Sequence, residues 1–83
     1  MPEFQLSKHA RDMLKERNLR EEWVWRTINT PDSKRRDAHD DNMHYTKAIK
    51  EREGLVLHVV VSQNTQPYRI VTVFFDRRLG KRS

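Results

Sequence analysis

The chain has 83 residues, enough for one hydrophobic core and too few for a second domain. Hydrophobic and charged residues each make up 35% of it, and the absence of cysteine excludes disulfide scaffolds, thiolate zinc sites and cysteine nucleophiles. The formal net charge of +5 favours a polyanionic partner, nucleic acid first.

Membrane segments are not expected. No apolar run approaches the roughly 18 residues that a membrane span needs. The first residues, Met-Pro-Glu-Phe-Gln, lack the basic start and apolar stretch of a signal peptide. We therefore expect a cytoplasmic protein without membrane contact.

Two helices are predicted in the first third of the chain. Phe4 and Leu6 alternate with polar residues, which indicates a short edge strand or an apolar lead-in to a helix. Ser7 is placed as the N-cap of a helix through about Glu16. After a turn, a second helix is expected from Glu21 to about Asn29, before Pro31.

Strands follow in the rest of the chain. Residues 31–42 are polar and predict a loop or the ragged start of an edge strand. Residues 43–51 alternate as a strand does, and Arg52-Glu53-Gly54 is typical of a three-residue hairpin loop. Further strands are expected over 55–62 and 68–75.

This order predicts an α+β domain in which two N-terminal helices pack on a three- to four-stranded antiparallel sheet. We expect the domain to span residues 1–76, and residues 77–83 to form a basic, mobile tail.

The hairpin loop also predicts a strand register. It places Ala48 opposite His58, and the odd-numbered residues on the core face. If Val73 and Phe75 join that face, Thr72 lies opposite His58 and Ile70 opposite Val60. The outer face would then carry a set of apolar side chains that could bind a partner: Tyr68, Ile70 and Phe74.

His58 is the most informative candidate for chemistry, because it is the one ionisable residue in an otherwise apolar strand. A histidine can act as general acid or base in breaking a phosphodiester. The alternative is a half-buried histidine that Thr72 orients through a hydrogen bond. Cationic side chains that could bind the phosphates of a nucleic acid are Lys47, Lys50, Arg69, Arg77 and Arg78, with His44 as a further cation.

No cofactor or metal site is expected. Residues of the types that bind metals do gather in one segment, at Asp37, His39, Asp40, Asp41 and His44. Their spacing, however, matches no zinc or calcium template. Phosphate-binding glycine motifs and nucleophile elbows are also missing from the sequence.

A resemblance extends over most of the chain. The strings Leu6-Ser7-Lys8-His9-Ala10, Met13 to Leu19 and Ile70-Val71-Thr72-Val73-Phe74, with Val24 and Pro31, resemble a small bacterial family of unknown function. That family is similar to BrnT and, more distantly, to the RelE/ParE toxins of toxin-antitoxin pairs. The resemblance implies two helices on a small antiparallel sheet and a metal-independent ribonuclease toxin or a relative of one, although some relatives attack gyrase.

The resemblance also implies roles for single residues. His9 and Arg17 match the family's helix-one histidine and turn arginine, and are therefore catalytic candidates together with His58; Thr72 matches a last-strand threonine. Arg17 could instead bind carbonyls at the end of helix one. Met13 stands where relatives often carry arginine, and Asn18 where glycine is usual.

Two functions remain open on this basis. One is a toxin-like domain that binds RNA or cleaves it without a metal. The other is a non-enzymatic interaction module that binds an antitoxin, or a second copy of itself, through the outer sheet face. A DNA-binding helix-turn-helix is disfavoured, because Glu21 and Glu22 on the second helix would face phosphates.

Overall fold

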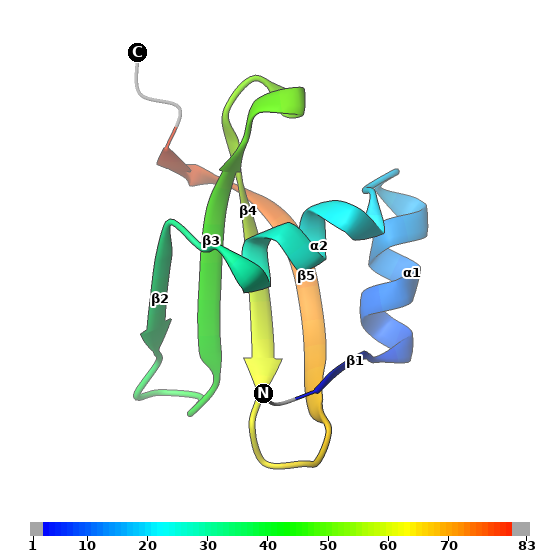
Figure 1. Cartoon of the computed structure of the whole chain (residues 1–83), viewed down its shortest axis with the longest axis vertical. Helices are drawn as coiled ribbons and strands as arrows, with labels where there is room; N and C mark the ends of the chain where they lie inside the picture. The colour runs from blue at the N-terminus through cyan, green and yellow to red at the C-terminus, as the bar shows by residue number, and fades with distance from the viewer. Residues whose placement is uncertain (1–2, 81–83) are drawn as a thin grey trace.

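The computed structural model describes residues 3–80. Two helices cover one face of a five-stranded sheet, and the strand order across the sheet is β1-β5-β4-β3-β2 (Figure 1). The elements along the chain are β1 (Phe4–Leu6), α1 (Lys8–Glu16), α2 (Glu21–Asn29), β2 (Ser33–Arg36), β3 (Met43–Ile49), the 3₁₀ turn η1 (Lys50–Arg52), β4 (Leu55–Ser62) and β5 (Tyr68–Gly80). The α+β class is confirmed.

Both helices begin and end as the sequence predicts. The Ser7 side chain accepts a hydrogen bond from the backbone N–H of Ala10, which caps α1. Asn18 adopts a left-handed conformation (φ 55°) that reverses the chain, and the Leu19 N–H then donates to the Leu14 carbonyl. Each helix buries one stripe of side chains against the sheet: Ala10 and Leu14 from α1, and Trp23, Val24, Thr27 and Ile28 from α2.

The sheet is larger than predicted and is mixed rather than antiparallel. β1 pairs in parallel with β5, and the polar segment after α2 supplies β2 as an edge strand antiparallel to β3. The sequence left an edge strand as one of two alternatives both for the segment around Phe4 and for residues 31–42. Each segment does supply an edge strand. Each is short, and β2 is exposed along its whole length, so periodicity gave only a weak signal.

The register between β3 and β4 differs from the predicted one by two residues. β3 ends at Ile49, and η1 lengthens the connection so that Ile49 lies opposite Leu55. His58 consequently faces Thr46, and the predicted pair of Ala48 with His58 is wrong. The odd-numbered core face is confirmed, since Tyr45, Leu57 and others lie in the core.

The predicted register between β4 and β5 is wrong by two residues at His58, which lies opposite Phe74, and a bulge accounts for one of the two. Val60 lies opposite Thr72 but Val61 lies opposite Ile70, which leaves Val71 as the extra residue. The bulge turns Ile70 into the core, where it is fully buried, and Tyr68 packs against the same core. Of the three apolar residues placed on the outer face, only Phe74 lies there, opposite His58.

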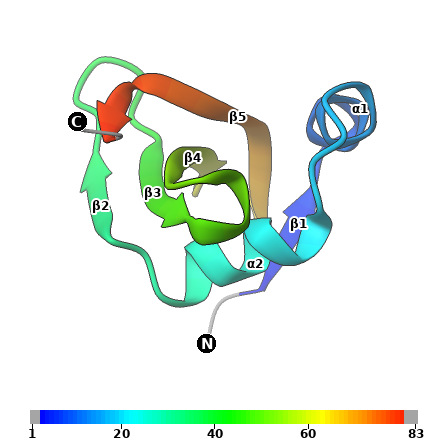
Figure 2. The same ribbon diagram turned by 90° about the horizontal axis from the view of Figure 1, so that it is seen from above.

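The end of β5 bends over the outer face, by which we mean the sheet face opposite α2 (Figure 2). Arg77 to Gly80 belong to this strand, although we expected them in a tail; the rest of that tail, residues 81–83, lies outside the described residues. The bend encloses part of the outer face, where Val56, His58 and Val60 are buried without helix cover. Within residues 3–80, no helix has the length and apolar character needed to cross a membrane.

Candidate functional site

Four polar side chains form a hydrogen-bonded row along the outer face. The buried end is Asp76, whose Oδ2 lies 3.2 Å from His58 Nδ1. His58 Nε2 lies 2.7 Å from His44 Nδ1, and His44 Nε2 lies 3.3 Å from Asp40 Oδ2. We call these residues, Asp40, His44, His58 and Asp76, the histidine row.

The sheet brings the row together from three strands and a loop. His44 and Thr46 point to the same face of β3, so the pair of Thr46 with His58 puts His44 diagonally beside His58. Asp76 lies where β5 bends, between the pairs Leu57 with Phe75 and Leu55 with Gly80. Asp40 comes from the loop between β2 and β3.

The two ends of the row differ in exposure. The Asp76 side chain is 3% exposed, whereas that of Asp40 is 44% exposed. Arg78 binds Asp76 through its guanidinium and its backbone N–H, and these bonds, opposed by burial and aided by His58, lower the pKa of Asp76 to about 2. Asp76 is therefore a carboxylate at neutral pH.

His58 is held as a neutral imidazole. Burial lowers its pKa, the hydrogen bond that it donates to Asp76 raises it, and the nearby charge of His44 lowers it again. The Phe74 ring stacks on the imidazole at 4.8 Å between centroids, which removes one face of the ring from water. The strand and its neighbours thus fix both the position and the charge of His58.

The hydrogen bonds of the row require one more positive charge than two neutral imidazoles provide. A carboxylate at each end can only accept a hydrogen bond, so the ring nitrogen beside each carboxylate must carry a proton. The bond between the two rings needs one further proton. Three N–H groups are therefore required, while two neutral rings carry only two. Because Asp76 takes the N–H of His58 and His58 accepts from His44, the place left for a cation, either a proton or a metal ion, is His44 Nε2, at the exposed end.

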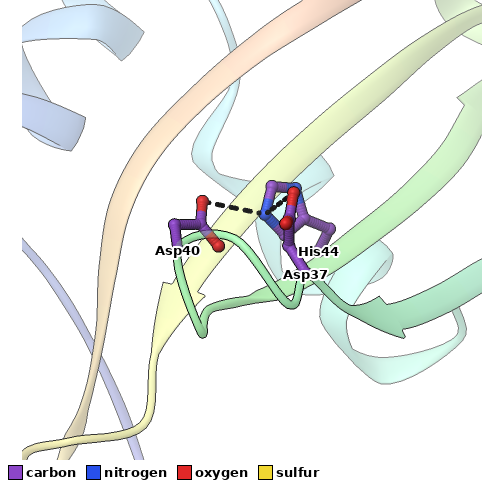
Figure 3. A group of neighbouring side chains, drawn as sticks. All are labelled: Asp37, Asp40 and His44. Atoms are coloured by element: carbon purple, nitrogen blue, oxygen red, sulfur yellow. Dashed lines mark hydrogen bonds and ion pairs between the residues drawn. The ribbon is translucent and has the colours of Figure 1, made fainter.

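The loop of residues 37–42 places two carboxylates at that nitrogen. Asp37 Oδ2 lies 3.7 Å and Asp40 Oδ2 3.3 Å from His44 Nε2 (Figure 3). The other oxygen of each carboxylate accepts a backbone N–H two residues later in the chain, from His39 and Asn42 respectively. The bond from Asn42 is also the main cause of the lowered pKa of Asp40. Among the described residues, these three form a group whose ligand atoms, within 4.8 Å of one another, are close enough to hold a metal ion.

A cleft of about 240 Å³ opens beside the histidines. Arg35 and Ser33 line it from β2, Thr46 from β3, and both His44 and His58 contribute to its wall. Arg35 lies opposite His44 in the sheet, and its charge contributes to lowering the pKa of His58. The cleft therefore combines two cations, Arg35 and Lys47, with two hydroxyl groups, the two imidazoles and the carboxylate of Asp32.

The other residues predicted for the site lie elsewhere. His9 is exposed on α1, which packs against β5 from the helix side, and Arg17 lines a cavity at the turn between the helices. Thr72 lies opposite Val60, so it does not orient His58 as we expected. The histidine row does not include His9, Arg17 or Thr72.

Of the predicted cations, Lys47 lines the same cleft as the two histidines, and the others lie elsewhere. Lys47 binds the Thr30 carbonyl at 2.7 Å and Asp32, and thereby holds the segment after α2. Lys50 lies in η1, and Arg69 lines a different cavity with Lys8 and Arg11. Arg78 neutralises Asp76, and Arg77 is exposed beside it.

The residues that sequence reasoning missed are Asp76, as the partner of His58, and Arg35. An aspartate at the end of an apolar strand is a signal that could have indicated the first, because a carboxylate there needs a buried partner. Asp37, Asp40 and His44 were considered as ligands and set aside on spacing, but a turn brings them within 4.8 Å of one another.

Comparison with known proteins places this chain in a family. The model of a domain of unknown function, DUF4258, matches residues 6–75. The chain belongs to this family. The DUF4258 match spans both helices and nearly all of the sheet, including His44 and His58, and stops just before Asp76. No curated protein and no solved structure matches the chain.

Proposed function

We propose that this DUF4258 domain binds RNA and cleaves it without a metal, as a toxin-like ribonuclease. The observation that carries the proposal is the histidine row beside a cleft that contains Arg35. Acid-base cleavage of RNA needs a group that exchanges protons and a cation that stabilises the developing charge on phosphorus. His44 and Arg35 lie opposite each other on neighbouring strands and supply these two groups.

The proposed reaction begins at the ribose 2′-hydroxyl. A neutral histidine accepts the 2′ proton while the 2′ oxygen attacks the adjacent phosphorus. The bond from phosphorus to the 5′ oxygen breaks, and an imidazolium or water donates a proton to that oxygen. The products are a 2′,3′-cyclic phosphate and a free 5′-hydroxyl, so atoms and protons balance without a metal.

Within the row, each residue has a separate role in this proposal. His44 exchanges the proton, because it lines the cleft and stands at the exposed end of the row. His58 and Asp76 are positioning residues: they fix the tautomer and orientation of His44 from below. Arg35 binds the phosphate.

A toxin-antitoxin setting is part of the same proposal. The resemblance to BrnT and to the RelE/ParE toxins suggests a RelE-like ribonuclease of the cytoplasm, with an antitoxin protein as its partner. The net charge of +5 supports RNA as the target, since phosphates would be attracted to the chain before the site is engaged.

The alternative function is a non-enzymatic interaction module that binds an antitoxin or forms a homodimer through the outer sheet face. The structure favours it less than the sequence did, because Ile70 is fully buried and Tyr68 packs on the core. Phe74 is itself covered on one side by His58. Little apolar area is therefore left on that face for a partner.

Labelled RNA in EDTA, with and without ribosomes, tests the proposal. We expect cleavage by the parent protein, loss of cleavage in His44→Gln, and retention in His39→Gln, which changes an exposed histidine of the neighbouring loop. His9→Ala should also retain activity. Cleavage that survives in His44→Gln but disappears in His9→Ala would move the active site to α1.

RNA binding is measured separately from cleavage. Binding through several phosphates should weaken steeply as salt rises, whereas apolar association should hardly change. Salt-insensitive self-association, with no RNA binding and no cleavage, would support the interaction module instead.

A further inference from the structure

We propose that Asp37, Asp40 and His44 form a binding site for a divalent transition-metal ion of the zinc class. The inference does not rest on the proposed cleavage of RNA, because it concerns binding alone. It combines three observations: the spacing of the ligand atoms, the way the carboxylates are held, and the tautomer that the row imposes on His44.

The spacing fits a small tetrahedral ion. Zinc binds imidazole nitrogen and carboxylate oxygen at about 2.1 Å, so two of its ligand atoms lie about 3.4 Å apart. In the structure, His44 Nε2 lies 3.3 Å from Asp40 Oδ2 and 3.7 Å from Asp37 Oδ2. The three ligand atoms lie within 4.8 Å of one another, so both distances to His44 already fit and binding would draw the two carboxylates toward each other.

The carboxylates are already oriented. Asp37 Oδ1 accepts the His39 N–H at 2.7 Å, and Asp40 Oδ1 accepts the Asn42 N–H at 3.0 Å. In each residue this leaves Oδ2 directed at His44 Nε2 (Figure 3). The third carboxylate of the loop is directed elsewhere, since Asp41 pairs with Arg36 at 3.2 Å.

The row fixes the tautomer of His44 independently of the loop. His58 donates to Asp76 through Nδ1, so its Nε2 accepts from His44 Nδ1. Without a proton on Nε2, His44 presents a lone pair there, and this lone pair faces two carboxylates. Such an arrangement repels unless a cation lies between them, and a metal ion satisfies all three atoms at once.

The same arrangement is typical of metal sites in which a ligating histidine donates its second ring N–H to another group of the protein. Here His58 receives that N–H, and Asp76 in turn receives the N–H of His58. One imidazole and two carboxylates favour zinc or a related transition metal over magnesium and calcium, which prefer oxygen ligands alone. Three protein ligands leave a coordination position for water or substrate.

The site is accessible to an ion from solution. The side chains of Asp40 and Asp37 are 44% and 31% exposed, while that of His44 is 11% exposed and anchors the ion from below. If the ribonuclease proposal also holds, a zinc ion on Nε2 takes the place of the proton. Cleavage would then proceed in EDTA, and added zinc without EDTA would inhibit it.

Titration calorimetry on chelator-stripped protein tests the inference directly, with Zn²⁺ as the probe and Mg²⁺ as the comparison. We expect one Zn²⁺ per chain and no comparable binding of Mg²⁺. Asp37→Asn combined with Asp40→Asn should remove this binding, whereas Asp41→Asn, in the same loop, should leave it unchanged. His39→Gln and His9→Ala control for adventitious binding by exposed histidines.

The role of His58 gives a second readout. His58→Gln should weaken Zn²⁺ binding about 10- to 100-fold, as loss of a ligand's hydrogen-bonded partner commonly does. Circular dichroism verifies that each variant is folded, and the visible spectrum of the Co²⁺ complex reports tetrahedral coordination. Absence of Zn²⁺ binding, or binding that persists in the double Asp variant, would overturn the site whether or not RNA is cleaved.

Discussion

Asp76 offers the sharpest test of how the histidine row stabilises the fold. Its carboxylate is 3% exposed, and its pKa is lowered from 3.8 to about 2, chiefly by the hydrogen bonds of Arg78. A shift of that size corresponds to roughly 2.4 kcal/mol of stability at neutral pH. Because the Arg78 side chain is 85% exposed and screened by water, we expect about 1 to 2 kcal/mol.

The sign of the effect follows from the direction of the shift. A lowered carboxyl pKa stabilises the folded state above about pH 4, and this contribution is lost as the pH falls toward 2. Asp76→Asn mimics the protonated acid in shape, so it should cost the full amount at pH 7 and only a few tenths of a kcal/mol at pH 2.

Urea denaturation of the parent and of Asp76→Asn across this pH range measures the difference. Other carboxylates that titrate in the same range, such as Glu51, are present in both proteins and cancel. Asp12→Asn, which removes an exposed pair with Lys8, is the control and should change stability little at any pH. A difference for Asp76→Asn that stays equal at pH 2 and pH 7 would refute the ion-pair reasoning.

Three further predictions address the core, the hairpin and the cleft. Leu57→Ala, in the fully buried part of β4, should lower the free energy of unfolding by about 2 to 5 kcal/mol, measured by urea denaturation; a loss below 1 kcal/mol would contradict the assigned core. Gly54→Ala should cost about 1 kcal/mol, because φ is +82° although no atom obstructs the added methyl group; an unchanged midpoint would contradict the turn geometry. Arg35→Ala should lower the slope of log binding constant against log salt for RNA by about one, and an unchanged slope would mean that Arg35 binds no phosphate.

Much of the fold could be predicted from local signals. Both helices were predicted because Ser7 and Pro31 mark boundaries and the apolar spacing is regular between them. The three long strands were recognisable from alternation and from β-branched residues. The core face followed from the same alternation, since it depends only on neighbouring residues.

Register was predictable only in part, because it depends on backbone details at two points. η1 lengthens the β3–β4 connection, and the bulge at Val71 reverses the faces of β5 before it. An extra residue puts the side chains on its two sides out of step by one, so a face assigned from Val73 and Phe75 placed Ile70 outside although it is buried. No local residue pattern announces such a bulge.

Only one residue of the candidate site, His58, could be predicted from the sequence. His58 stood out because a histidine within an apolar strand needs a partner. Its partners could not be identified, since His44 and Asp76 reach it only through the true register and the bend of β5. The carboxylates of the loop likewise meet at His44 because of a turn that spacing rules do not describe.

The role of the 2′-hydroxyl tests the proposed metal-independent cleavage of RNA most directly. The substrate is a DNA strand with ribonucleotides at a mapped cleavage position, incubated with the protein in EDTA, beside the same strand made entirely of DNA. We expect cleavage of the ribonucleotide-containing strand alone, with a 2′,3′-cyclic phosphate and a 5′-hydroxyl as products, and loss of this cleavage in His44→Gln. Cleavage of the all-DNA strand, products with a 5′-phosphate, or no cleavage of either strand would contradict the proposal.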